Sequence, residues 1–172
     1  MPAGVDLAVV AVPPHQVLEV VEDCGAARVK AVVVITAGFA EIGPSGLALQ
    51  DRLIEKVRAF GMRLVGPNCM GVLNTDPDVR LNASFAGHLP PPGRVALASQ
   101  SGGLGLAILA LAAERQMGLC TFVSLGNKAD VSGNDLLQYG EDDPKTSVIL
   151  LYVESFGNPR RFARLARRIG RT

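Results

Sequence analysis

The sequence predicts an α/β protein built from two doubly wound parallel-sheet units. Short apolar runs rich in β-branched residues alternate along the chain with segments whose apolar residues recur at helical spacing. The apolar runs are nearly continuous, which is typical of strands buried on both faces of a parallel sheet. A proline-rich stretch with neither pattern divides the series into two parts.

This alternation predicts the elements in chain order. The expected strands are Leu7–Val12, Ala31–Ile35, Arg63–Gly66, Val95–Ala98, Leu119–Ser124 and Ser147–Val153. The expected helices are Gln16–Ala27, Leu47–Phe60, Leu104–Met117, Asp135–Gly140 and Pro159–Gly170. Each unit then has about three strands, whereas five or six are usual for an open doubly wound sheet. We therefore expect both units to be truncated, the first at its start and the second at its end.

The stretch from Gly66 to Gly93 interrupts the alternation. It carries five prolines together with several Asn, Asp and Gly residues, and it lacks helical periodicity. Such a long stretch without regular structure is uncommon inside a compact domain. We therefore expect a first domain over residues 1–76, a linker over 77–93 and a second domain over 94–172.

Composition and charge argue against several classes of protein. The 172 residues are 48% hydrophobic and 19% charged with a formal net charge of +1, which gives no general attraction to nucleic acid or anionic lipid. No apolar run reaches the roughly 18 residues of a membrane span, and no basic leader opens the sequence. The three cysteines lack the spacing of a zinc site or a disulfide framework. We expect a cytoplasmic protein without nucleic-acid, membrane or metal partners.

Six arginines lie between Arg160 and Arg171. The last expected helix has its own apolar stripe, which includes Phe162 and Leu165. The arginines are therefore interpreted as the solvated face of that helix.

The candidate site of the first unit follows its strands. Ligands of open parallel sheets bind beyond the carboxyl ends of the strands. There the sequence places Pro13–Pro14, Thr36–Gly38 and Gly66–Cys69, a rim of small residues and turn-formers that can contact an extended ligand closely. Ordinary tight turns remain the alternative. No GxGxxG follows the first strand, so a diphosphate cradle of that kind is absent from the sequence.

The candidate site of the second unit is the corner Ser99–Gly103. Ser101 is a natural N-cap, and the glycines leave the first-turn amides unobstructed at the positive end of a helix dipole, which suits a phosphate. Plain helix capping remains the alternative. Glu154 directly follows the run SVILLYV and is well placed to orient a cationic or protonated group.

Nucleophilic chemistry finds less support. Ser99 and Ser101 lie outside a GxSxG motif, and neither His15 nor His88 has a position that suits a triad. Cys69 is interpreted as a small thiol in an apolar site and not as an activated thiolate.

Several motifs in one order give the sequence a family resemblance. The series VDLAVVAVPP, VVVITAGFAE, GMRLVGPNCMGVLNT, LASQSGGLGLAIL, VSLGNKADVSGNDLLQY and LLYVESFGNP resembles the NDP-forming acyl-CoA synthetases, which are related to the α subunit of succinyl-CoA synthetase. The resemblance covers almost the whole chain. It implies a CoA-binding Rossmann-like domain followed by a flavodoxin-like succinyl-CoA synthetase domain.

The resemblance also implies roles for residues. It assigns the CoA groove to Val12, Pro13, Ile35, Thr36, Ala37, Asn68, Cys69 and Met70, with the thiol end near the turn at Asn68. It assigns the binding of the phosphate of a phosphohistidine to Ser99, Ser101, Gly102 and Gly103, and the hydrogen bond to that histidine to Glu154. The implied reaction converts acyl-CoA, phosphate and ADP into acid, CoA and ATP through acyl phosphate and phosphohistidine. Amide dipoles suit the phosphoryl group, and a carboxylate fixes the tautomer of an imidazole.

Parts of the family pattern are missing from these residues. The glycine-rich CoA phosphate loop, the phosphorylated histidine loop and the ATP-grasp part are expected elsewhere, so we expect the chain alone not to complete the reaction. ADP or ATP and Mg²⁺ would bind only in that ATP-grasp (β-type) domain or subunit. Ala37 replaces an acidic residue of the succinate enzyme. Exposed sheet edges favour a homo- or hetero-oligomer.

Two alternatives stay open. The stretch TDPDVRLNASFAGHLPPPGRVALASQSG resembles at least as closely the ligase-like regions fused to GNAT-type protein lysine acetyltransferases, which would make the chain a CoA-sensing regulatory module without ligase activity. A nicotinamide- or flavin-binding domain would share the fold class but lacks its glycine fingerprint here.

Overall fold

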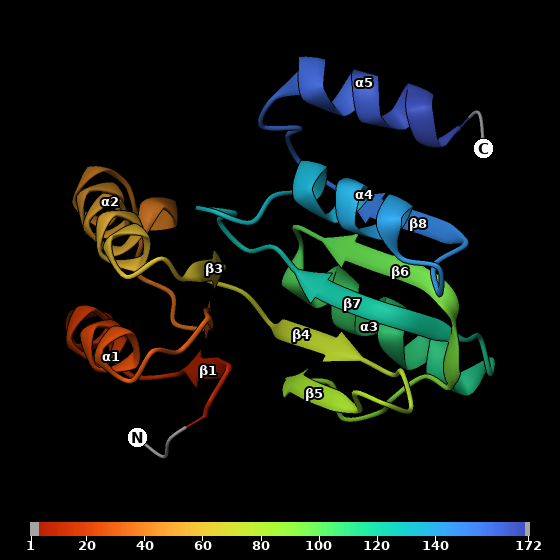
Figure 1. The fold of residues 1–172 in the computed structure, drawn as a ribbon, viewed down its shortest axis with the longest axis horizontal. Coiled ribbons are helices and arrows are strands. Elements are labelled where there is room, and N and C mark those ends of the chain that lie inside the picture. The colour runs from red at the N-terminus through yellow and green to blue at the C-terminus, as the bar shows by residue number, and fades with distance from the viewer. Residues whose placement is uncertain (1–3, 171–172) are drawn as a thin grey trace. The chain divides into compact units, whose positions relative to one another are not determined.

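The computed structural model describes residues 4–170 and separates them into two compact units. Unit 1 comprises residues 4–71 together with the segment Leu125–Val131. Unit 2 comprises Val72–Ser124 and residues 132–170. The elements of each unit are labelled along the chain in Figure 1.

Unit 1 is a three-stranded parallel sheet with two helices. Its elements are β1 (Leu7–Val10), α1 (Pro14–Ala26), β2 (Ala31–Val34), the 3₁₀ turn η1 (Ala40–Ile42), α2 (Pro44–Ala59) and β3 (Arg63–Val65). The strand order is β1-β2-β3. Val10 pairs with Val34 and Val33 with Val65, so the carboxyl ends of all three strands meet at one edge. The turns that follow these strands therefore gather there.

The core of unit 1 follows from helical spacing. Val17, Val21 and Cys24 lie on one face of α1 and are buried in the same cluster as Leu53 of α2 and Leu64 of β3. Both helices begin with a proline, whose fixed φ and missing N–H suit the first helical position.

Unit 2 is a mixed five-stranded sheet. Its elements are β4 (Gly71–Asn74), β5 (Leu81–Ser84), β6 (Pro92–Ser99), α3 (Gly102–Glu114), β7 (Leu119–Ser124), α4 (Gly133–Asp142), β8 (Val148–Tyr152) and α5 (Pro159–Ile169). The strand order is β5-β4-β7-β6-β8, in which β6 runs parallel to β7 and β8 and β4 runs antiparallel to β7. The helices α3 and α4 lie on opposite faces of this sheet (Figure 1).

Helix α3 packs unusually closely on its sheet because of Gly105. A Cβ atom added at Gly105 would lie 2.8 Å from the ring of Phe122 and 3.2 Å from the Cβ of Ser99. Leu97, Leu109 and Phe122 belong to the buried cluster beneath the helix. The glycine therefore serves helix–sheet packing and brings the start of α3 close to the end of β6.

The predicted fold class is confirmed, and each expected strand and helix forms with its ends shifted by a few residues. The division of the chain differs from the expected one. The segment expected as a linker contains β5, and β4 pairs with β7 in the second sheet. These strands are four residues each and carry asparagines, so their composition resembles that of a loop.

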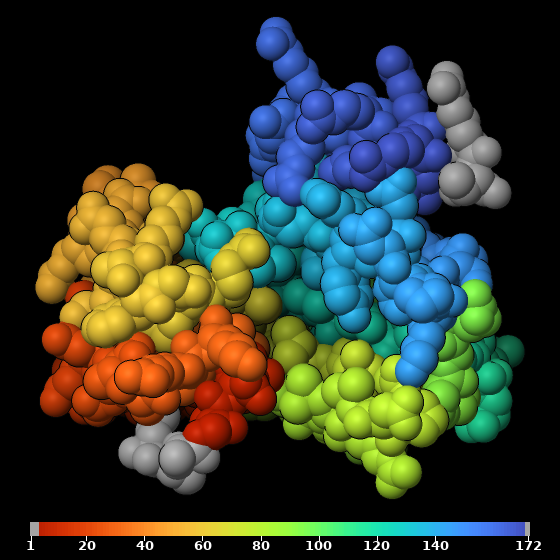
Figure 2. All heavy atoms as spheres, in the orientation of Figure 1, coloured from red at the N-terminus to blue at the C-terminus, as the bar shows by residue number. Residues whose placement is uncertain are grey.

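The arginine-rich helix α5 has a buried apolar position at Leu165, and long side chains extend from its surface (Figure 2). Arg161 forms an ion pair with Asp135 at 3.0 Å, and Arg168 forms one with Glu141. Within residues 4–170, every helix falls short of the length and hydropathy needed to cross a bilayer.

Candidate functional site

The three turns of unit 1 are joined to one another by hydrogen bonds. The hydroxyl of Thr36, after β2, donates to the carbonyl of Val12, after β1, at 2.6 Å. The backbone N–H of Asn68, after β3, donates to the carbonyl of Thr36 at 3.0 Å. The structure thus brings together the three turns that carry the residues assigned to CoA, with Pro13, Ala37 and Asn68 exposed.

Glycine permits the sharp course of the chain in two of these turns. Gly38 has a φ of +103° and Gly66 has a φ of +97°. A Cβ atom at Gly66 would lie 2.5 Å from the carbonyl oxygen of Val34. Because both φ values lie in the region that favours glycine, these positions require glycine.

Cys69 is buried beneath the third turn. Its Sγ donates a hydrogen bond to the carbonyl of Val34 at 3.4 Å. Burial raises the pKa of the Cys69 thiol to about 11, so the thiol stays protonated at neutral pH. The interpretation of Cys69 as a structural thiol agrees with this environment.

Asn127 belongs to the strand-end turn Ser124–Asn127, to which the sequence analysis assigned no role, and its side chain joins two of these turns. The Nδ2 atom of Asn127 donates to Glu41 Oε2 at 2.6 Å and to Gln50 Oε1 at 2.9 Å. Its Oδ1 accepts a hydrogen bond from Asn68 Nδ2 at 3.3 Å. Gln50 was a signal available in the sequence, because it is a polar residue at a core-facing position of α2 and is only 8% exposed.

Glu41 completes this polar cluster. Its Oε1 accepts hydrogen bonds from the backbone N–H groups of Gly38 and Phe39. Burial acts to raise the pKa of Glu41, but the hydrogen bonds from Asn127 and from the backbone outweigh it and hold this pKa below its usual range. The carboxylate is therefore ionised at neutral pH and ties the turn after β2 to Asn127.

In unit 2, the predicted cap is present at the start of α3. Ser101 is the N-cap, and its Oγ accepts a hydrogen bond from the backbone N–H of Leu104 at 3.4 Å. The amides of Gly102 and Gly103 belong to the first turn, which lacks intrahelical acceptors. A Cβ atom at Gly103 would meet nothing within 4 Å, so this helix start is open.

Ser99 has a different position from the one expected of a phosphate-binding residue. It is fully buried, and its hydroxyl donates to the carbonyl of Ser101 at 2.6 Å. The Ser99 side chain therefore supports the corner through a bond to its backbone, and its hydroxyl is shielded from solvent.

Gln100 connects this corner to Glu154, and the sequence analysis did not single it out. Gln100 Oε1 accepts hydrogen bonds from the backbone N–H groups of Glu154 at 3.0 Å and Ser155 at 3.4 Å. Its Nε2 donates to Glu154 Oε2 at 3.4 Å. The exposed Glu154 carboxylate is thus held near the loop that leads into α3. Gln100 could have been found from the sequence, because it is a polar residue directly after a buried strand.

The two histidines have no part in the contacts described for these sites, and the acidic residues do not form a metal site. His15 and His88 are both exposed. Within residues 4–170, no three His, Cys, Asp or Glu side chains form a group that could hold a metal ion.

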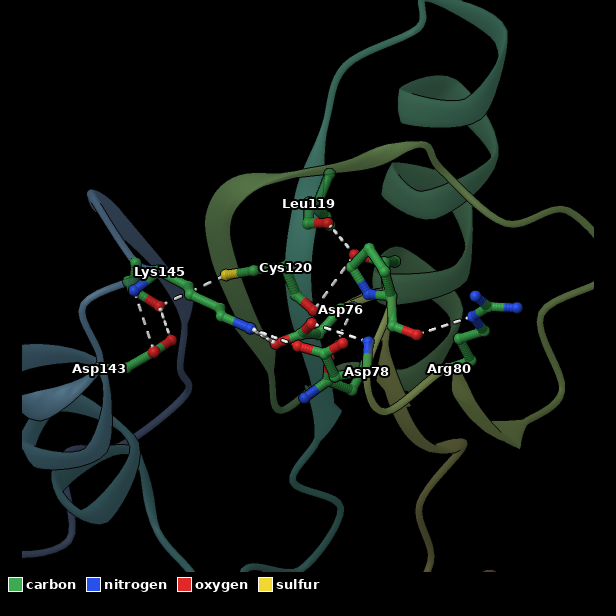
Figure 3. A network of polar contacts seen from close by, with 11 residues as sticks. Asp76, Asp78, Arg80, Leu119, Cys120, Asp143 and Lys145 are labelled. Carbon is green, nitrogen blue, oxygen red and sulfur yellow. Dashed lines mark hydrogen bonds and ion pairs between the residues drawn. The ribbon is translucent and has the colours of Figure 1, made fainter.

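A polar network lies at the opposite end of the unit 2 sheet, where β6 and β7 begin (Figure 3). Lys145 forms ion pairs with Asp76 and Asp78, and a cleft of about 220 Å³ is lined by Asp76, Lys145 and neighbouring residues. Thr146 Oγ1 donates to Asp143 Oδ2 at 2.7 Å. Because its cations and carboxylates pair with one another, this network is interpreted as a brace between the turn after β4 and the segment before β8.

The chain is thus an α/β protein in which three strand-end turns are joined by hydrogen bonds and one helix start is open. Residues 2–75 match the family model described as "CoA binding domain", and residues 92–172 match "Succinyl-CoA ligase like flavodoxin domain". Together these two matches span most of the chain, which is similar over nearly its whole length to part of the ADP-forming acetate–CoA ligases.

Individual relatives show this similarity. The chain is 42% identical to the α subunit of acetate–CoA ligase [ADP-forming] I from Pyrococcus furiosus, over 99% of this chain and 37% of the relative. It is also 42% identical to acetate–CoA ligase [ADP-forming] I from Archaeoglobus fulgidus, over 99% of this chain and 25% of the relative. The chain thus spans between a quarter and about two fifths of these relatives.

A solved structure shows the same fold. The dinucleotide-forming acetyl-coenzyme A synthetase 1 of Ca. Korarchaeum cryptofilum, solved in complex with phosphate and ADP, superposes with a TM-score of 0.90 at 42% identity, over 98% of this chain and 36% of that chain. The alternative of an acetyltransferase-linked regulatory module receives no support from these comparisons.

Proposed function

We propose that this chain supplies the CoA-binding and phosphate-binding parts of an ADP-forming acyl-CoA ligase. In the complete reaction, phosphate displaces CoA from acyl-CoA to give acyl phosphate, and a histidine takes the phosphoryl group and releases the acid. Transfer of that phosphoryl group to ADP then gives ATP. The observation that carries the proposal is the presence, in one chain, of three strand-end turns joined by hydrogen bonds and of an open helix start whose preceding corner holds the carboxylate of Glu154.

The turns of unit 1 suit CoA. The groove residues Val12, Pro13, Ile35, Thr36, Ala37, Asn68, Cys69 and Met70 belong to turns that hydrogen bonds hold together, and small or exposed side chains let a long ligand approach the backbone. CoA would supply the thiol that carries the acyl group. The raised pKa of buried Cys69 argues that this residue shapes the turn and does not itself react.

The corner of unit 2 suits the phosphoryl group. The first-turn amides of Gly102 and Gly103 and the helix dipole stabilise a dianion at the start of α3. Ser101 caps the helix, and Ser99 supports the turn through a bond to its backbone. Glu154 would accept a hydrogen bond from the imidazole of the histidine and so fix its tautomer.

The remaining components of the enzyme follow from the same proposal. An ATP-grasp (β-type) domain or subunit would bind ADP or ATP with Mg²⁺, and the assembly would be an oligomer. Three buried free cysteines agree with the reducing environment of the cytoplasm.

Calorimetric titration of the chain with CoA and with NADH tests the groove. We expect heat of binding from CoA and none from NADH. Binding of NADH without binding of CoA would contradict the proposal.

Titration with inorganic phosphate tests the corner separately. Gly103→Asp places a carboxylate at the open helix start. The helix dipole stabilises this carboxylate, so the helix stays folded, but the carboxylate repels phosphate. We expect about a tenfold loss of phosphate affinity, equivalent to about 1.4 kcal/mol. Gly87→Asp is the matched control, since a Cβ atom at exposed Gly87 also meets nothing within 4 Å. Equal phosphate affinity in the two variants would argue against a phosphate site at α3.

A further inference from the structure

We propose that Asn127 is a positioning residue of the CoA groove, whose side-chain amide sets the turn after β2 relative to the turn after β3. This inference rests on the proposed function, because it concerns the groove assigned there to CoA. It goes further by assigning a role to a residue outside the strand-end turns of the first half of the sequence.

The backbone around Asn127 is fixed to unit 1 independently of its side chain. The N–H of Asn127 donates to Pro67 O at 2.9 Å, the N–H of Ala129 to Gly66 O at 3.0 Å and the N–H of Val131 to Leu64 O at 3.1 Å. These bonds hold the segment along β3 and the turn that follows it. A substitution of the Asn127 side chain therefore changes the polar cluster and leaves the path of the backbone in place.

The amide of Asn127 uses its hydrogen-bonding capacity on three different segments. Its two N–H groups reach Glu41 and Gln50, and its oxygen accepts from Asn68. An amide has both donors and an acceptor, whereas a carboxylate of the same shape has acceptors only. Asparagine is thus matched to a position that faces two acceptors and one donor.

The bond to Glu41 has the largest consequence for the groove. Glu41 is the residue that accepts from the backbone of Gly38 and Phe39, so the orientation of its carboxylate determines the shape of the turn after β2. Hydrogen bonds to a charged group are stronger than those between neutral groups. Loss of the Asn127 donor frees the Glu41 carboxylate and, with it, the turn that carries Ala37.

The affected part of the ligand is predicted by the position of the cluster. Asn68 joins it directly, and the proposed function places the thiol end of CoA near that turn. We therefore expect displacement of these turns to weaken contacts with the pantetheine arm and to leave contacts with the nucleotide end unchanged.

The experiment compares two ligands on the purified chain by isothermal titration calorimetry. The ligands are CoA and adenosine 3′,5′-bisphosphate, which lacks the pantetheine arm. Asn127→Asp replaces the donors with a second carboxylate next to Glu41. We expect about a tenfold loss of affinity for CoA and less than a twofold change for the bisphosphate.

Two further variants separate positioning from general damage to the fold. Asn82→Asp makes the same change at an exposed asparagine of unit 2 that only accepts hydrogen bonds from Ser84, so we expect it to keep the original CoA affinity. In the double variant Glu41→Gln with Asn127→Asp, the amide at position 41 donates to the carboxylate at position 127. This exchange restores the hydrogen bond with reversed direction, and we expect CoA affinity to return to within about threefold of the original.

The outcomes are distinguishable. Unchanged CoA affinity in Asn127→Asp, equal losses for both ligands or failure of the double variant to recover would each overturn the positioning role. Absence of CoA binding by the unsubstituted chain would overturn the proposed function itself, and this inference with it.

Discussion

The two candidate sites differ in how their residues are held. In unit 1, the turns after three strands are joined by hydrogen bonds from Thr36, Asn68 and Asn127, residues that are far apart in the sequence. In unit 2, five consecutive residues build the corner, and the side chain of one of them, Gln100, is hydrogen-bonded to Glu154. The comparison teaches that the candidate site proposed for a long ligand is assembled from distant segments, whereas the candidate site proposed for a small anion is assembled from neighbouring residues.

The largest effect is expected when the distant bracing of unit 1 is removed as a whole. A polypeptide of residues 1–75 lacks the segment Leu125–Val131. Its absence leaves Leu64 without the backbone bond from Val131 and without the carboxylate of Asp130, which accepts from Leu64 N at 3.0 Å. We expect this polypeptide to lack the cooperative thermal transition of the whole chain, as measured by circular dichroism.

The same measurement can break the comparison. If residues 1–75 unfold as sharply and at the same temperature as unit 1 does in the whole chain, the distant segment does not stabilise unit 1. In that case the sites would not differ in the way described.

A pair of identical substitutions is expected to have opposite effects in the two sites. Gly126→Ala adds a Cβ atom 2.2 Å from the carbonyl oxygen of Pro67 at a φ of +54°, so we expect a loss of about 2 kcal/mol in the free energy of unfolding. Gly103→Ala adds a Cβ atom in open space within a helix, so we expect no loss and a gain of at most about 1 kcal/mol. Urea denaturation of both variants measures the difference. Similar losses in the two would show that the corner of unit 2 is also tightly enclosed.

The smallest effect is expected from loosening the tether of unit 2. Gln100→Ala removes hydrogen bonds to the exposed loop at Glu154 and Ser155, each worth about 1 kcal/mol, so we expect their amides to exchange with solvent roughly fivefold faster. Hydrogen exchange followed by NMR gives the rates. Gln138→Ala is the control, because Gln138 is exposed and accepts instead from Arg161. Unchanged exchange at Glu154 in the Gln100 variant would show that the loop is held by other contacts.

The elements that could be predicted from the sequence are those with local signals. Apolar periodicity predicts α1 and α2, and the order of serine and glycine before an apolar run predicts the Ser101 cap. The strands β4 and β5 were missed, because their four-residue length and their asparagines outweigh a weak alternation of buried and half-buried positions. The antiparallel pairing of β4 with the sheet depends on contacts with β7, which have no local pattern in the sequence.

In the candidate sites too, residues with a local signal could be predicted, whereas those that depend on distant contacts could not. Glu154 and Ser101 could be found because each lies two residues after the end of a strand. Asn127 also follows a strand, yet its partners Glu41 and Gln50 lie far away in the sequence. Backbone hydrogen bonds from the segment Leu125–Val131 to residues 64–67 bring them together. The sequence places Ser99 at the corner but does not reveal that its hydroxyl is buried. This burial depends on the close approach of α3 to the sheet at Gly105.

The segment Leu125–Val131 also has a consequence for how such proteins are inherited. The matched family models divide the chain into residues 2–75 and 92–172, but this segment lies inside the second stretch and belongs to unit 1. A recombination event with a single crossover between the two stretches would combine a CoA-binding unit from one parent with its bracing segment from another. We therefore expect the two units to be inherited together. In hybrids between distant parents, we expect unit 1 to be destabilised more than unit 2.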